Sequence, residues 1–309
     1  MAARATRSAS RKARRTEAVA TGPLGALSHD ELGVIFDGLA DPLQPVVAVA
    51  LSSTCLGLRT PLRAALEVLT ERHARAVALC RKVKTSCAEL RDAKLLDWAN
   101  GLTADNVATL AMILQTNGLP RLKHLRLTGN GFGDAGMQTL CEGLSHGAMP
   151  SLLFLGLGGN NIGLAGVQAL GAAISRGAIP NITEMNISQN SLGGVMTVLS
   201  TSLCKLPNLK LLAIASSQIG DEGVASLVAD LGKDDFKALE ELRVAYNSIT
   251  DQGCRALIAA VDEGAFPALR HGGIGQDSGN NVSVAVLEAL DRSLRSRGGD
   301  GYSSEHSSV

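Results

Sequence analysis

The residue types that most often carry chemistry are present, but their spacing does not assemble a catalytic or metal site. The six cysteines contain no C-x-x-C pair, and neither they nor the six histidines have the spacing of a zinc site. The segment Gly131-x-Gly133-x-x-Gly136 fits the dinucleotide-binding fingerprint. Glycines recur at the same phase farther along the chain, which favours a repeated turn over one nucleotide site. We therefore predict no enzyme activity, no metal and no cofactor.

Charge and composition narrow the classes of partner. The chain has 309 residues, and its 29 Lys and Arg balance 29 Asp and Glu, so the formal net charge is zero. A nucleic-acid binder needs a surplus of positive charge on one face, so we expect no nucleic-acid partner. The longest apolar run, Val46 to Leu51, is too short to cross a bilayer, so we expect no membrane partner. With nucleic-acid and membrane partners excluded, we expect a monomer that binds other proteins.

One pattern recurs five times through the middle of the chain and sets the fold. Its first copy is Leu122-x-x-Leu125-x-Leu127-x-x-Asn130-x-Phe132, and successive copies begin 30, 30, 27 and 30 residues apart. The alternation in this copy predicts a short strand with two buried side chains. After each Asn, apolar residues spaced by 3 and then 4 predict a helix. Each unit is therefore a strand followed by a helix, and the helix supplies the crossover that parallel strands need.

This pattern resembles the leucine-rich repeat family in its long, ribonuclease-inhibitor-like form. The resemblance implies an α/β fold, a curved parallel sheet with helices on its outer side, preceded here by a small all-α segment. Weaker copies at both ends extend the array to about seven units over residues 92–296. Counting back 30 residues places Asp97 where a buried Leu is expected. The recurring Asn predicts a ladder of side-chain amides, interrupted by Ser217. The last, weaker copy has Asp277 at the Asn position.

Residues 23–91 do not follow the repeat and are predicted to be helical. Ser28 and Glu31 form a capping box, Thr60-Pro61 opens a longer helix that runs to about Thr85, and Ser86 caps another. The opening of this segment resembles an F-box domain, although Ser28 stands where that family usually has Pro. The resemblance implies binding to the adaptor of a cullin-type ubiquitin ligase. The candidate contacts are Leu27, Leu32, Ile35, Phe36 and Leu39. The alternative is a helical cap that seals the first repeat.

The outward positions of successive strands line one face, which is the concave side on which curved repeats usually bind. Arginine and bulky apolar side chains on such a face tend to dominate protein interfaces. The candidate protein-binding residues are His124, Arg126, Phe154, Glu184, Asn186, Leu211, Glu241 and Arg243. Trp98 lies near the first strand, and we expect it to be buried.

These features predict a non-enzymatic protein–protein interaction module. The F-box resemblance implies a ubiquitin-ligase substrate receptor that holds its target on the concave face. The alternative is a stand-alone repeat scaffold, or a regulator of a small GTPase similar to Ran GTPase-activating proteins. Residues 1–22 form a basic tail, read either as disordered or as a targeting signal, and residues 297–309 form a second disordered tail. We expect the chain in the cytoplasm, with the nucleus as the alternative.

Overall fold

The computed structural model describes residues 27–53, 62–116, 118–144, 148–204, 206–275 and 278–296. The chain divides into two compact units between Arg91 and Asp92. Both predicted tails, the helix start at Thr60-Pro61 and the ladder position at Asp277 lie outside the described residues.

The described part of the first unit is helical. Its elements are α2 (His29–Leu39), α3 (Val46–Ser53), α5 (Arg63–Lys82) and α6 (Cys87–Asp92), the last of which ends at the division. The predicted capping box is present, because the Ser28 N–H donates to Glu31 Oε2 at 2.8 Å and the Glu31 N–H donates to Ser28 Oγ at 3.2 Å. Ser86 and Glu89 form the same pair of bonds at the start of α6. The helix predicted to run to Thr85 ends at Lys82, two residues before Lys84 takes a positive φ.

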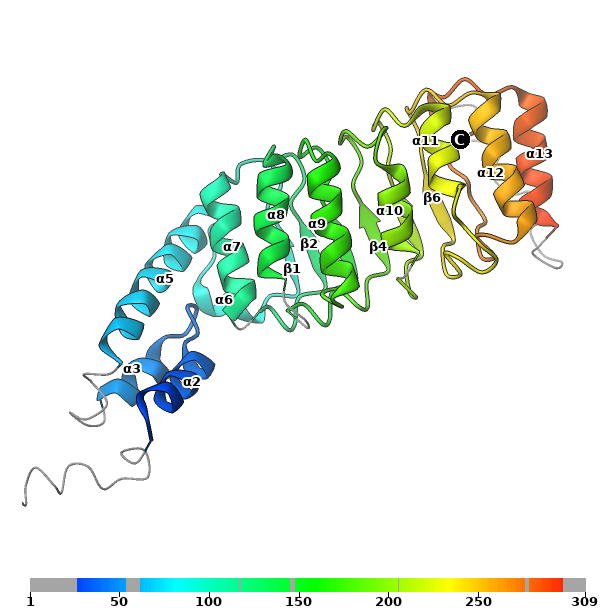
Figure 1. Cartoon of the computed structure of the whole chain (residues 1–309). Helices are drawn as coiled ribbons and strands as arrows, with labels where there is room; N and C mark the ends of the chain where they lie inside the picture. Colours follow the sequence, from blue (N-terminus) through cyan, green and yellow to red (C-terminus); the bar gives the residue numbers. More distant parts are fainter. Residues whose placement is uncertain are drawn as a thin grey trace, which may run out of the picture. The chain divides into compact units, whose positions relative to one another are not determined.

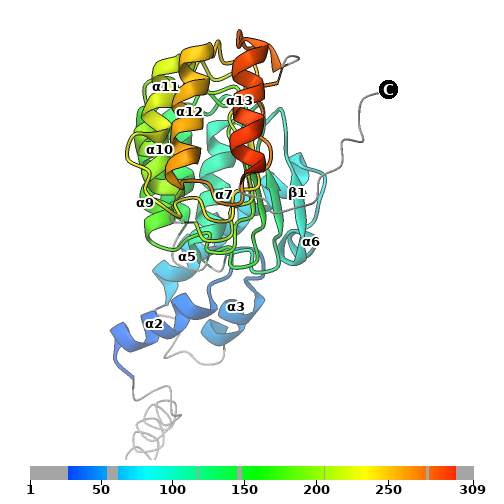
Figure 2. The ribbon, with the colours of Figure 1, turned by 90° about the vertical axis from the view of Figure 1, so that its right-hand side faces the viewer.

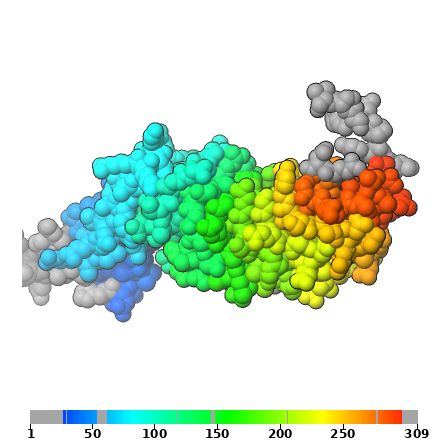
Figure 3. All heavy atoms as spheres, turned by 90° about the horizontal axis from the view of Figure 1, so that it is seen from above, coloured from blue at the N-terminus to red at the C-terminus, as the bar shows by residue number. Residues whose placement is uncertain are grey.

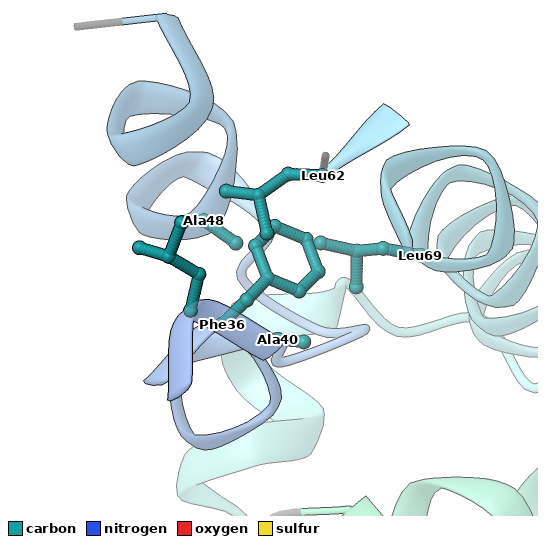
Figure 4. Packing of buried hydrophobic residues seen from close by; sticks show 6 residues of the cluster. Phe36, Ala40, Ala48, Leu62 and Leu69 are labelled. Atoms are coloured by element: carbon teal, nitrogen blue, oxygen red, sulfur yellow. The ribbon is translucent and has the colours of Figure 1, made fainter. Parts of the chain in front are cut away.

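Phe36 is the centre of a small core in this unit. Figure 4 shows its ring among Ala40, Ala48, Leu62 and Leu69. Ala48 lies in α3 and Leu69 in α5, whereas Ala40 directly follows α2 and Leu62 directly precedes α5. The Phe36 side chain is 1% exposed. Burial of one Phe contributes about 2–3 kcal/mol, so this cluster is what holds the short helices together.

The second unit contains a sheet of six short parallel strands that pair in chain order. The strands are β1 (Leu95–Asp97), β2 (His124–Arg126), β3 (Phe154–Gly156), β4 (Glu184–Asn186), β5 (Leu211–Ala213) and β6 (Glu241–Arg243). The central residue of every strand is buried, as the alternating pattern predicts. A bridge between Glu241 and His271 continues the array by one more unit.

A helix follows each strand and returns the chain to the start of the next one. These helices are α7 (Ala104–Thr116), α8 (Gly133–Gly143), α9 (Leu164–Ser175), α10 (Met196–Leu203), α11 (Gly220–Val228) and α12 (Asp251–Glu263), and α13 (Val284–Arg295) follows the bridge. They stand side by side in chain order (Figure 1), and they lie on one side of the sheet (Figure 2). The space-filling view shows the same order along the repeats as successive colours (Figure 3). The predicted α/β solenoid, preceded by a helical segment, is therefore confirmed.

The first strand differs from the expected register by one residue. β1 pairs Leu96 with Leu125 and Asp97 with Arg126, so this unit is 29 residues long (96 to 125) instead of 30. Asp97 is therefore exposed, and the buried positions are Leu96 and Trp98, at 6% and 8% exposure. The register counted back by 30 was wrong because a shift of one residue moves every side chain of a strand to the other face. The expectation that Trp98 is buried is confirmed.

The recurring Asn forms the predicted ladder. Asn160 Oδ1 accepts from the backbone N–H groups of Asn130 and Gly131 at 2.9 and 3.0 Å. Its Nδ2 donates to the carbonyl oxygens of Leu127 and Leu157 at 2.9 and 2.8 Å. One side chain thus satisfies backbone groups of two consecutive units where both strands turn.

Ser217 weakens the ladder in the fifth strand unit, because its hydroxyl lies 3.5 Å from the N–H of Asn190. The ladder is restored at Asn247, whose Oδ1 accepts from the Ser217 N–H at 2.7 Å. Asn280 then holds the last ladder position, since it accepts from the Asn247 N–H at 3.0 Å.

Candidate protein-interaction surfaces

The eight residues predicted to bind protein lie on β2 to β6 in two rows. The first row, in register across adjacent strands, is His124, Phe154, Glu184, Leu211 and Glu241. The second row is Arg126, Gly156, Asn186, Ala213 and Arg243. These two rows, with Leu95 and Asp97 of β1, are called the strand face below. The sheet therefore brings all eight predicted residues onto one face.

Arg126 and Phe154 form a preorganised cluster at one end of the strand face. Arg126 Nη1 lies 3.4 Å from Asp97 Oδ2, and its guanidinium carbon lies 5.4 Å from the centre of the Phe154 ring. The ring of His124 is 6.3 Å from the same ring. A Cβ at Gly156 would lie 3.0 Å from Phe154 Cε1, so the absence of a side chain there gives the ring its room. An arginine held by a carboxylate and a ring loses little rotamer entropy on binding.

A second arginine–carboxylate pair lies at the other end of this face. Arg243 donates to Glu241 from Nε at 2.6 Å and from Nη2 at 3.1 Å. This hydrogen bond, with the charges of Glu241 and Glu184, raises the pKa of Arg243 despite its partial burial. Four strand spacings of about 4.8 Å separate the two arginines by about 19 Å. Between them the same row carries the small residues Gly156 and Ala213, both buried.

Three aspartates, which sequence reasoning missed, tie consecutive units together. Asp134 Oδ1 accepts from the N–H groups of Gly163 and Gly166 at 2.6 and 3.0 Å. Asp221 and Asp251 occupy the same position in later units and bind the start of the following helix. The signal was available, because each of these residues follows its ladder Asn or Ser by four positions. These carboxylates are structural and lie outside the strand face.

The carboxylate of Asp221 is held in its charged form. Desolvation pushes its pKa up, but hydrogen bonds from the Thr250 hydroxyl, the Thr250 N–H and the Gly253 N–H outweigh this, and the pKa is lowered. Two hydrogen bonds from Ser283 lower the pKa of Asp251 in the same way. A carboxylate with a lowered folded-state pKa stabilises the fold above its unfolded pKa, and the effect is lost as the pH falls through the folded value.

The five candidate adaptor contacts do not form one exposed patch. Leu32 and Phe36 are 4% and 1% exposed and belong to the core of the helical segment. Leu27 and Leu39 pack against that core, which leaves Ile35 with 36% of its surface exposed. In this structure the four inner residues position the helices, and Ile35 is available to a partner.

Other apolar side chains are exposed on these helices. On α2, Val34 is 74% exposed, and on α3 the values are 68% for Val46, 49% for Val47 and 45% for Val49. The sequence contained a signal for this exposure, because the first six residues of α3, Val46 to Leu51, are all apolar. A short helix beside a small core buries only one side, so some of these residues must be exposed. Val34, Ile35, Val46, Val47 and Val49 are called the valine patch below.

The remaining sequence motifs belong to the fold. Gly131 and Gly133 have positive φ angles of 61° and 63°, as expected for residues of the repeated turn. In the described ranges, no group of three or more His, Cys, Asp or Glu residues is arranged to hold a metal ion. The described helices include none with the length and apolar character needed to cross a bilayer.

Comparison with protein-family models matches the model described as "Leucine Rich repeat" at residues 119–141, 148–171, 205–228 and 238–257. No curated protein matches the chain. The matched segments contain β2, β3, β5 and β6, each with all or part of the helix that follows it. Since these segments are also the strand–helix units that stack in register, the chain is a leucine-rich repeat protein.

Proposed function

We propose that this protein is a substrate receptor of a cullin-type ubiquitin ligase. In this proposal the helical segment 23–91 docks on the ligase adaptor, and the repeats of residues 92–296 hold a target protein on the strand face. The general role has independent support, because leucine-rich repeats indicate a protein-interaction module. We also assign the repeats to the ribonuclease-inhibitor-like type, on the basis of their α-helical return segments.

The valine patch is the observation that carries the adaptor role. A single exposed apolar side chain needs no explanation, but several on one small segment favour an interaction site. Five β-branched side chains are exposed on two short helices that share one core. A segment that served as a cap alone would gain solubility from polar residues at these positions, so the patch favours a partner.

The strand face supplies a second surface for the target. Arginine and aromatic residues carry much of the binding energy in protein interfaces, especially where their geometry is fixed before contact. Arg126 and Phe154 meet this description, because Asp97 and the ring itself fix the guanidinium. We therefore place the main target contact at this end of the face.

Binding of the purified adaptor to the full chain tests the proposal. We expect the double variant Val34→Asp/Ile35→Asp to bind at least tenfold more weakly, since each carboxylate must be desolvated at the interface. Val68→Asp is the matched control, because Val68 is also 48% exposed but lies on α5, outside the valine patch. Isothermal titration calorimetry measures both affinities.

If the adaptor does not bind the wild-type chain, and circular dichroism shows that the chain is folded, the result contradicts the receptor role. That result would favour the alternative, a stand-alone repeat scaffold or a regulator of a small GTPase. Equal losses for the double variant and for Val68→Asp would show that the valine patch is not the docking site.

A further inference from the structure

Two cysteines of the helical segment are in contact. Cys80 lies in the last turn of α5, and its Sγ is 3.7 Å from the Sγ of Cys87, the first residue of α6. Both thiols are free. Since a disulfide bond is about 2.05 Å long, the two sulfur atoms need to approach by less than about 2 Å to bond.

The connection between the two helices holds this pair together. The Thr85 N–H donates to the carbonyl oxygen of Cys80 at 2.9 Å, and Lys84 turns the chain with a φ of 57°. The Ser86–Glu89 cap then fixes the start of α6. A bond between the sulfur atoms therefore closes a short loop that is already folded back.

The two thiols have different environments. Cys80 is 2% exposed, and its burial, together with a hydrogen bond and the charge of Cys87, raises its pKa to about 12. Cys87 is partly exposed. The greater exposure of Cys87 favours its reaction with a small oxidant first. The 3.7 Å contact between the sulfur atoms places Cys80 to resolve the oxidised product.

We propose that Cys80 and Cys87 form a reversible disulfide in response to hydrogen peroxide. The Cys87 thiolate attacks one peroxide oxygen, so that an S–O bond forms, the O–O bond breaks and hydroxide leaves. The Cys80 sulfur then attacks the Cys87 sulfenic acid, the S–S bond forms, and the hydroxyl leaves with the Cys80 proton as water. The first hydroxide takes the proton that the Cys87 thiol released. Two thiols lose two electrons in total, and one peroxide becomes two waters.

This modification acts at a place separate from the strand face and the valine patch. It fixes the end of α5 to the start of α6, which restricts the unfolded chain and raises the melting temperature of the segment. Because the two surfaces proposed for function do not include these cysteines, the inference stands or fails independently of the ligase role.

Peptide mapping of the full-length, reduced protein tests the proposal. Trypsin cleaves after Arg75, Arg81, Lys84 and Arg91, so the two cysteines fall on separate peptides, residues 76–81 and 85–91. One equivalent of hydrogen peroxide, followed by alkylation of free thiols, is expected to link these peptides with the loss of about 2 Da. Dithiothreitol added before alkylation is expected to remove the link.

Single variants separate the roles of the two thiols. Cys87→Ser is expected to leave Cys80 reduced, whereas Cys80→Ser is expected to accumulate a Cys87 sulfenic acid that dimedone traps. Cys254→Ser is the matched control, because Cys254 is buried in α12, and its loss is expected to leave the link unchanged. Cys87→Ser changes a partly exposed residue, so the test does not depend on whether Cys80→Ser folds.

Three results would overturn the proposal. In the first, both thiols stay reduced at one equivalent of peroxide and are then alkylated. In the second, Cys87 links to a cysteine other than Cys80. The third is oxidation of Cys80 in Cys87→Ser at the wild-type rate, which would show that Cys87 is not the entry point.

Discussion

At the residue scale, single polar side chains in this protein make the hydrogen bonds that backbone groups need at the turns. Each ladder asparagine has an acceptor and two donors, so one amide satisfies N–H and carbonyl groups of two units. A serine has one rotating hydroxyl and cannot do this. The 3.5 Å contact from the Asn190 N–H to Ser217, against 2.9 Å at the equivalent Asn160 bond, records the difference. Buried backbone groups cost about 1–3 kcal/mol each when unpaired, so the asparagine positions are the sensitive ones.

The aspartates that join units predict an acid-sensitive fold. Asp221→Ala removes an acceptor of three hydrogen bonds and is expected to lower the free energy of unfolding at pH 7 by about 1–3 kcal/mol. The pKa of Asp221 is lowered in the fold, so its contribution is complete above about pH 4, near the unfolded value. As the pH falls further, the wild-type chain loses this contribution and the gap between the two proteins narrows.

Urea unfolding at pH 7 and at pH 3 measures that gap. Asp230→Ala is the control, because Asp230 is exposed just beyond α11 and its removal is expected to change stability by less than about 0.5 kcal/mol at both pH values. A gap for Asp221→Ala that is the same at pH 7 and pH 3 would argue against a charge-dependent role.

At the element scale, strands of three residues place one side chain inward and two outward. A strand of three residues has few hydrogen bonds that oppose a shift of register by one residue. Its register therefore depends on which side chain is buried in the core. β1 illustrates this, because Leu96 and Trp98 are buried and Asp97 is not. The burial of an apolar residue therefore determines the register more strongly than the repeat length does. This unit has 29 residues instead of 30, and Leu96 takes the buried position.

Neighbouring residues of β3 give a direct test of this alternation. Leu155→Asp is expected to destabilise the repeat domain by more than about 4 kcal/mol, since it places an unpaired charge in a site that is 1% exposed. Phe154→Asp, on the outward side of the same strand, is expected to cost about 1 kcal/mol or less. Thermal unfolding followed by circular dichroism compares the two variants, and similar melting temperatures would show that the register is wrong.

At the scale of the whole molecule, two compact units carry two different surfaces. The helical segment presents an apolar patch, and the repeats present a polar face with two arginine–carboxylate pairs. Surfaces of these two kinds favour different partners. In the proposed function, one binds the adaptor and the other binds the target.

The strand face predicts which variants lose the target. Arg126→Ala and Phe154→Ala are each expected to reduce the recovery of strand-face partners by about tenfold or more, because both remove a preorganised contact. Leu164→Asp is the control, since Leu164 is 48% exposed on α9 and lies outside the strand face. Quantitative mass spectrometry of proteins captured by each variant measures the effect. If the control loses the same proteins as the two strand-face variants, the helices form the binding surface.

The sequence by itself determined the repeat, the parallel sheet and the strand-face residues of β2 to β6, because a period of two and a helical spacing of 3 and 4 depend on local geometry. It also located the asparagine ladder and both capping boxes. The tertiary structure decided what depends on contacts between distant residues. It set the register of β1, placed Asp97 beside Arg126 and buried Leu32 and Phe36 while leaving the valine patch exposed. Apolar side chains compete for a core of limited volume. Which of them are buried depends on how distant elements pack together, and the pattern of one helix does not contain that information.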